Sequence, residues 1–212
     1  MRGVIFDLDG TLVDSLRDIA DAMDQVLDEL GLPRRTLAEY ERFVGEGARV
    51  LVRRSLGQKV ELEDEALAAF RDRYRSRMLV HTRPYPGIEP LLEALASRGA
   101  PAAVLSNKPH DATVAIVDAL LSRHPFVAVL GHREGSPRKP DPSGALELAR
   151  AMSRAPSEVL FLGDTPIDVA TARAAGMIAV GALWGMRSRE ELEAAGAARV
   201  IERPEELLEL VE

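Results

Sequence analysis

Two aspartates stand at the end of a short apolar stretch near the start of the chain. Residues 3–8 have the pattern of a buried strand, and the segment Phe6-Asp7-Leu8-Asp9-Gly10-Thr11 ends it with a turn. Alternation along extended backbone directs Asp7 and Asp9 to the same side. One carboxylate can attack phosphorus to form an aspartyl-phosphate, and the other can protonate the leaving oxygen and then activate water. The pattern indicates phosphoryl transfer, with a simple capped turn as the alternative.

A hydroxyl and a lysine follow two later apolar runs. Ser106 and Asn107 come directly after residues 102–105, where a hydroxyl and a backbone N–H can bind a phosphate oxygen. Lys139 precedes a helical pattern at 142–152 and is suited to neutralise charge on a transferred phosphoryl group. Ordinary helix capping is the alternative at both places. Lys108 alone reads as a solvated surface charge.

Two more aspartates follow the apolar run 159–162. Asp164 offers the hard oxygen ligand that Mg²⁺ prefers, and Asp168 stands at the start of an expected helix. Asp168 can support the ligands or stabilise the helix terminus. A Mg²⁺ ion bridging Asp7, Asp164 and a substrate phosphate would offset the repulsion between the carboxylates.

These side chains need elements that bring several strand ends together. From residue 88 onward, helical patterns alternate with short apolar runs, which predicts an α/β fold with a Rossmann-like, doubly wound parallel sheet. In such a sheet the ligand site lies at the carboxyl ends of the strands. The expected strands are 3–8, 102–105, 126–130, 159–162, 178–180 and 199–201. The expected helices are 88–98, 110–121, 142–152, 167–175, 188–195 and a short one at the C-terminus.

The stretch between the first strand and residue 88 lacks this alternation of helical patterns and apolar runs. Helical spacing runs from Asp14 to about His81 without a convincing strand, and the proline-rich segment 83–87 reads as a stiff linker. The stretch therefore reads as an insertion. We expect an α/β core formed by 1–13 and 84–212, and an all-helical cap formed by 14–83.

Composition excludes several classes of function. The 212 residues carry a net charge of -7, which disfavours binding to nucleic acid or to anionic membranes. The chain has no cysteine, so disulfides, thiolate zinc sites and a cysteine nucleophile are excluded. No apolar run has the length of a signal peptide core or a membrane span, and a cytoplasmic protein is the expectation. The four histidines lack metal-ligand spacing and read as structural or surface residues.

Together the motifs resemble those of the haloacid dehalogenase superfamily, over essentially the whole chain. The resemblance rests on Asp7-Leu8-Asp9-Gly10-Thr11, Ser106, Lys139-Pro140, and Gly163-Asp164 with Asp168. It implies that Asp7 is the nucleophile and a Mg²⁺ ligand, and that Asp9 is the acid/base and offers its backbone carbonyl to the metal. The dehalogenase branch itself is disfavoured, because it has no acidic residue at the position of Asp9. The remaining implied roles are phosphate binding by Thr11, Ser106, Asn107 and Lys139, and metal binding by Asp164 and Asp168.

Four further stretches are similar to the phosphoglycolate phosphatase group. They are Val13-Asp14-Ser15, Val44-Gly45-Glu46-Gly47, Pro84-Tyr85-Pro86-Gly87 and Ser106-Asn107-Lys108-Pro109. The similarity implies a mobile cap over the site, a small phosphorylated metabolite as substrate, and a monomer or homodimer. Arg49, just past the second stretch, is a candidate donor to a substrate carboxylate.

Other activities remain open at this point. Relatives that share these secondary motifs act on pyrophosphate, nucleotides and sugar phosphates, so a pyrophosphatase or nucleotidase is an alternative. A phosphomutase similar to β-phosphoglucomutase would pass the phosphoryl group from Asp7 to a sugar hydroxyl instead of water. A non-catalytic binding module is disfavoured, because every catalytic position is filled.

Overall fold

Six parallel strands form the sheet at the centre of the molecule. The computed structural model describes residues 1–212, and its strand order is β5-β4-β1-β6-β7-β8. Every neighbouring pair is parallel, as expected for a doubly wound sheet. The predicted α/β fold is confirmed. The strands are β1 (Gly3–Phe6), β4 (Ala102–Pro109), β5 (Phe126–His132), β6 (Val159–Gly163), β7 (Ile178–Ala182) and β8 (Arg199–Ile201).

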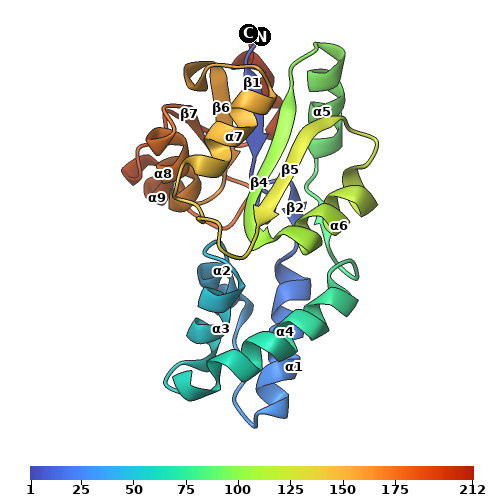
Figure 1. The fold of residues 1–212 in the computed structure, drawn as a ribbon, viewed down its shortest axis with the longest axis vertical. Coiled ribbons are helices and arrows are strands. Elements are labelled where there is room, and N and C mark those ends of the chain that lie inside the picture. Colours follow the sequence, from blue (N-terminus) through green and yellow to red (C-terminus); the bar gives the residue numbers. More distant parts are fainter.

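Helices cover both faces of this sheet (Figure 1). Side-chain alternation in β1 explains how: Val4 and Phe6 join the apolar cluster on one face, and Ile5 joins the cluster on the other. The first face is covered by α5 (Ile88–Ser97) and α6 (His110–Leu121). The second is covered by α7 (Ser143–Ala151), α8 (Pro166–Ala174) and α9 (Arg189–Ala194).

The C-terminal segment differs from the expected helix. It forms a 3₁₀ helix at Pro204–Glu209, which is six residues long. Pro204 begins the segment, and Leu207 and Val211 are buried against the first face of the sheet. The tighter 3₁₀ form is common in short terminal pieces, and the Leu210 N–H closes such an i→i+3 hydrogen bond to the Leu207 carbonyl at 3.0 Å.

A separate block of helices lies beyond the carboxyl ends of the strands, at the bottom of Figure 1. It has its own apolar core, in which Met23, Leu51 and Phe70 are buried. None of the helices combines the length and the hydrophobicity of a membrane span. The helical block (residues 16–77) contains α1 (Leu16–Glu29), α2 (Leu37–Phe43), α3 (Ala48–Leu56), a 3₁₀ turn at Val60–Leu62, and α4 (Glu63–Arg77).

Two chain segments join the helical block to the sheet, and they lie side by side. β2 (Val13–Asp14) pairs antiparallel with β3 (Arg83–Pro84), a ribbon that the sequence pattern does not predict. With two residues in each strand, the ribbon is too short to show a strand periodicity. The buried Asp18 carboxylate reinforces it by accepting backbone hydrogen bonds from His81 and Thr82 at 2.9–3.0 Å. The two connections therefore form one narrow junction.

Candidate active site

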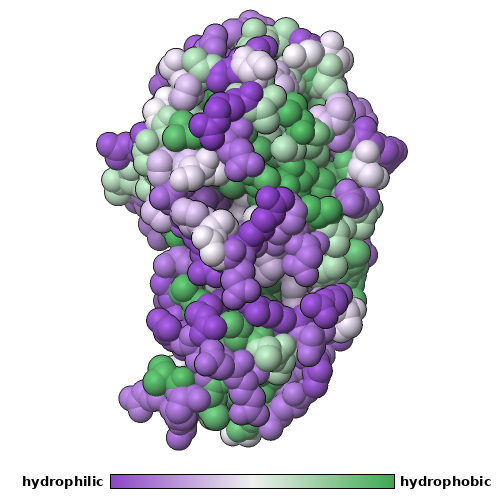
Figure 2. Space-filling view, in the orientation of Figure 1, coloured by the Kyte–Doolittle hydropathy of each residue, from purple (hydrophilic) through white to green (hydrophobic).

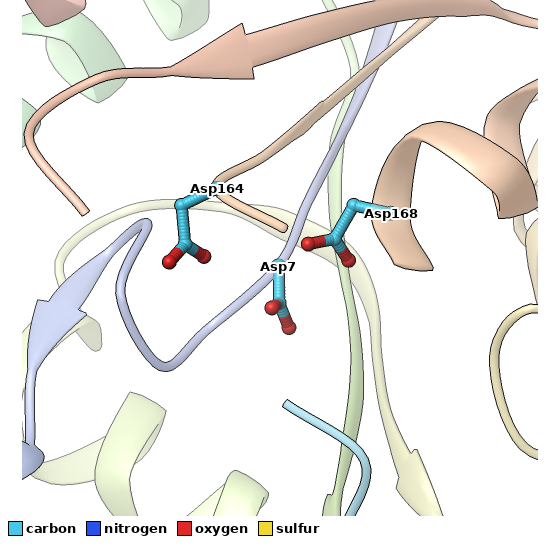
Figure 3. Close-up of side chains that lie close together, drawn as sticks. All are labelled: Asp7, Asp164 and Asp168. Atoms are coloured by element: carbon cyan, nitrogen blue, oxygen red, sulfur yellow. The ribbon is translucent and has the colours of Figure 1, made fainter. Parts of the chain in front are cut away.

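Three buried carboxylates converge at the carboxyl edge of the sheet (Figure 3). Asp7 directly follows β1, Asp164 directly follows β6, and Asp168 lies in the first turn of α8. One oxygen from each of the three lies within 4.8 Å of the others. The parallel arrangement of adjacent strands thus brings together residues that are far apart in the sequence.

The turn after β1 is shaped to receive Asp164. Thr11 Oγ1 donates to Asp164 Oδ1 at 3.0 Å, and the Met186 backbone N–H donates to Asp164 Oδ2 at 2.9 Å. Gly10 has a φ of +85°, and a Cβ atom there would overlap the Asp164 carboxylate. Gly185 is equally constrained, because a Cβ atom there would overlap Asp164 Cβ and the Gly10 carbonyl oxygen. Asp164 is therefore fixed by close packing as well as by hydrogen bonds.

Lys139 enters the cluster from the segment between β5 and α7. Its Nζ lies 2.8 Å from Asp7 Oδ1 and 2.7 Å from Asp168 Oδ1. Asn107 holds the Lys139 backbone, accepting from its N–H at 2.8 Å and donating to its carbonyl at 3.1 Å. The same Asn107 amide donates to the Gly45 carbonyl at 3.1 Å, which links the helical block to the sheet. In this geometry Asn107 acts on the position of Lys139.

The cluster carries more negative charge than its lysine can balance. Burial, followed by repulsion from Asp168, raises the pKa of Asp7 well above its usual range and raises the pKa of Asp164 to about 7. Burial lowers the pKa of Lys139, but attraction to Asp168 and Asp7 outweighs it and raises that pKa overall. One ammonium thus faces three carboxylates. This excess of hard oxygen donors fits a divalent cation such as Mg²⁺.

Asp9 lies outside the three-carboxylate cluster. Both of its oxygens are 2.8 Å from Lys108 Nζ, and Ser15 Oγ donates to one of them. Lys108 is 7% exposed, and its Nζ lies 4.6 Å from the centroid of the Tyr74 ring on α4. The interpretation of Lys108 as a solvated surface charge is therefore wrong. Its burial depends on Tyr74, and no local sequence signal reports that contact.

Two more predicted site residues lie in the same region. Ser106 is buried, and its hydroxyl accepts from the Lys108 backbone N–H at 3.2 Å. Arg49, by contrast, directs its guanidinium to Glu63 at 2.6 Å and to Asp64 at 2.8 Å. Hydrogen bonds from Arg53 and Arg49 lower the pKa of Glu63 to about 2. Arg49 is thus engaged within the helical block, and its contact with a substrate stays a prediction.

A cavity of about 860 Å³ separates the sheet from the helical block. Asp7, Asp9 and Ser106 line it from the sheet, and the loop 44–49 and helix α4 line it from the other side. His110 and His132 also line the cavity, although the sequence interpretation gave the histidines no part in the site. A small molecule in this cavity would touch both the carboxylate cluster and the helical block.

Comparison with known proteins agrees with this geometry. A family model described as haloacid dehalogenase-like hydrolase matches residues 1–176. A phosphoglycolate phosphatase from Aquifex aeolicus is 37% identical over 185 residues, covering 87% of this chain and 86% of the relative. A phosphoglycolate phosphatase from Rhodospirillum rubrum is 39% identical over 210 residues, covering 95% of this chain and 87% of the relative.

A solved structure shows the same arrangement of elements. The protein from Lactobacillus delbrueckii subsp. bulgaricus superimposes with a TM-score of 0.94 at 28% identity, covering 100% of this chain and 99% of its own. The motifs, the fold and the curated relatives therefore agree over most of the chain. The chain belongs to the haloacid dehalogenase-like hydrolases.

Proposed function

We propose that this protein is a Mg²⁺-dependent phosphatase that hydrolyses a small phosphomonoester through an aspartyl-phosphate on Asp7. The observation that carries the proposal is the buried meeting of Asp7, Asp164, Asp168 and Lys139 beside a cavity that also contains Asp9. Relatives named phosphoglycolate phosphatase cover most of the chain and support this reaction class.

The first step transfers the phosphoryl group to the protein. A carboxylate oxygen of Asp7 forms a bond to phosphorus as the ester P–O bond breaks, and Asp9, which enters this step protonated, supplies that proton to the leaving oxygen and becomes a carboxylate. Lys108 and Ser15 hold the Asp9 carboxylate in place for this transfer. Lys139 steadies Asp7, and Ser106 lines the cavity beside that carboxylate; we assign both side chains to binding phosphate oxygens.

The second step regenerates Asp7. Water attacks phosphorus, Asp9 accepts the proton of that water, and the bond between phosphorus and the Asp7 oxygen breaks to release phosphate. Mg²⁺ bound by Asp7, Asp164 and the Asp9 carbonyl, with Asp168 in support, would stabilise negative charge on the phosphoryl group. Thr11 and Asn107 act through their hydrogen bonds to Asp164 and Lys139.

We further propose that residues 14–83 act as a cap over a core of 1–13 and 84–212. The narrow ribbon of β2 and β3 is suited to a hinge, and the cavity lies between the two parts. Closure of such a cap would exclude water and add substrate contacts from the loop 44–49. Arg49 would reach a substrate carboxylate only by leaving Glu63 and Asp64.

Hydrolysis of aryl and alkyl phosphates with and without Mg²⁺ tests the proposal. Asp7→Asn should lower kcat more than about a thousandfold while circular dichroism stays unchanged. Asp118→Asn, at an exposed position on α6 outside the cavity, is the matched control and should retain full activity. Substantial activity in purified Asp7→Asn protein would reject Asp7 as the nucleophile. Product analysis with a hexose 1-phosphate shows whether water or a sugar hydroxyl accepts the phosphoryl group. Free phosphate supports hydrolysis, and an isomeric hexose phosphate supports a mutase.

A further inference from the structure

One wall of the cavity is rich in arginine. Arg133 and Arg138 come from the segment after β5, and Arg71 and Arg75 come from α4. β5 is the second neighbour of β1 in the sheet, which places its end about 10 Å from the β1 axis. On the face shown in Figure 2, strongly hydrophilic residues gather at the junction between the helical block and the sheet. This arginine wall (Arg71, Arg75, Arg133, Arg138) therefore faces the same cavity as Asp7 from a different strand.

Three of these arginines have no acidic partner. Arg71, Arg133 and Arg138 form no ion pair within 4.0 Å, although the chain has an excess of acidic residues. The other cations of the cavity are paired: Arg49 with Glu63, and Lys108 with Asp9. Arg71, Arg75 and Arg133 are exposed, and Arg138 is half-buried. Asp111 and Glu134 also line the cavity, but neither forms an ion pair with these arginines, so three guanidinium groups along this wall stay unneutralised. Such a cluster is suited to an anionic ligand.

Arg138 is held in position by a histidine and still has an unused donor. His132 Nε2 lies 3.2 Å from the Ser136 carbonyl and donates to it, which leaves Nδ1 to accept from Arg138 Nη2 at 3.4 Å. Burial, followed by the charge of Arg138, lowers the pKa of His132 and favours this neutral form. Arg138 Nε is buried without any hydrogen-bond partner. It lies beside Gly47, where a Cβ atom would be 3.3 Å from it.

Arg133 is also left without a suitable acceptor. The Gly131 N–H donates to His110 Nδ1 at 3.2 Å, so the proton of a neutral His110 ring is on Nε2. Arg133 Nη2 lies 3.0 Å from that same Nε2, which places two donors against each other. An oxyanion beside this pair would accept from both. Arg133 and Arg138, which line the same cavity, thus each carry an unmet hydrogen-bond donor.

We infer that the arginine wall binds a second anionic group of the substrate, separate from the phosphoryl group that is transferred. The inference rests on the proposed phosphatase function and deepens it, because it defines the substrate class as phosphomonoesters that carry another oxyanion. A carboxylate and a second phosphate share this chemistry. Arg133 and Arg138 are then specificity residues of the sheet side, whereas the sequence interpretation placed this role on Arg49.

Matched substrate pairs test the inference. One pair is 2-phosphoglycolate and 2-hydroxyethyl phosphate, which differ in a carboxylate. The other is propane-1,3-diol bisphosphate and its monophosphate, which differ in a phosphate. The wild-type protein should prefer the anionic member of at least one pair. Arg133→Gln and Arg138→Gln should each lower kcat/KM for that member by about ten- to hundredfold, while the uncharged member changes by less than about twofold. The pair with the larger loss identifies the anion.

Controls keep this test separate from the proposed function. Arg123→Gln, an exposed arginine outside the cavity, should leave both members of each pair unchanged. The inference about the arginine wall would be overturned if the variants lost kcat/KM equally for both members of a pair, or if the wild-type protein preferred neither member. Both outcomes would leave the proposed phosphatase function standing. Calorimetric titration of the same pairs into Asp7→Asn protein, with and without Arg138→Gln, reads binding without turnover. If Arg138→Gln leaves the affinity for the anionic members unchanged there, the inference is rejected whatever the activity.

Discussion

Replacing Lys108 by methionine removes one partner of a buried ion pair and keeps the length of the side chain. Lys108 Nζ contacts both oxygens of Asp9 at 2.8 Å, and the two side chains are 5% and 12% exposed. Removal of one partner from a buried pair costs about 3–5 kcal/mol, because the other charge is left uncompensated. Asp9 keeps the Ser15 hydroxyl and some access to water, so the lower end, about 3 kcal/mol, is expected.

The assay is urea unfolding of the metal-free protein, followed by thermal unfolding. A loss of about 3 kcal/mol lowers the Tm of a domain of this size by about 6–12 °C. Lys59→Met is the matched control: Lys59 is 57% exposed and 4.0 Å from Glu61, so its loss should change stability by less than about 0.5 kcal/mol. The double variant Asp9→Asn with Lys108→Met should be more stable than the sum of the single effects predicts.

The same variant probes the role of Lys108 in the reaction. If Lys108 holds the acid/base carboxylate, Lys108→Met should slow hydrolysis of alkyl phosphates more than that of aryl phosphates, whose leaving oxygen needs less protonation. A stability change below about 1 kcal/mol, together with equal effects on both ester classes, would refute the reasoning that Lys108 supports Asp9.

Three further predictions concern the carboxylate cluster and its supports. The fold raises the pKa of Asp164 from 3.8 to about 7. In the metal-free protein, protonated Asp164 therefore contributes at most about 4 kcal/mol to the free energy of unfolding. This contribution is full at low pH and is lost as the pH rises through 7. Millimolar Mg²⁺ should therefore raise the Tm more at about pH 8 than at about pH 5.5, and an equal rise would contradict this. Asn107→Ala should cost about 2–4 kcal/mol in urea unfolding, because the Lys139 backbone groups lose their partners, and a cost below about 1 kcal/mol would argue against that link. Gly185→Ala should lower kcat more than about tenfold by displacing Asp164. Gly3→Ala, where the added Cβ meets only the flexible side chains of Met152 and Arg154, should not; equal kcat values would contradict the packing argument.

The convergence of Asp7 and Asp164 could be predicted because it follows from a general property of parallel sheets. Each aspartate comes directly after an apolar strand, and the carboxyl ends of adjacent strands share one edge. Only the type and order of the strands are needed for this prediction. The helices of the inserted block could also be predicted from the sequence, because their apolar residues recur at helical spacing.

The partners of individual charged side chains could not be predicted in the same way. Lys108 becomes buried because Tyr74 on α4 lies above it, and Arg49 is engaged because α3 packs against the start of α4 at Glu63. Both contacts depend on how helices of the block pack in three dimensions. The pairing of Val13 with Pro84 likewise leaves no periodic signal in either segment.

The arginine wall could not be predicted from the sequence either. Arg133 and Arg138 lie in a segment of Gly, Ser and Pro that reads as an ordinary loop. Their significance appears only when β5 places them over the cavity without acidic partners. A count of net charge over the whole chain conceals this local excess of positive charge.

The most direct test of the account is chemical trapping of the phosphorylated aspartate. The wild-type protein is mixed with an aryl phosphate and Mg²⁺, quenched within the first turnovers and reduced with borohydride, which converts an aspartyl-phosphate to homoserine. Peptide mass spectrometry should then find homoserine at position 7 and unmodified Asp9. Homoserine at position 9, or none at any time during active turnover, would contradict nucleophilic attack by Asp7.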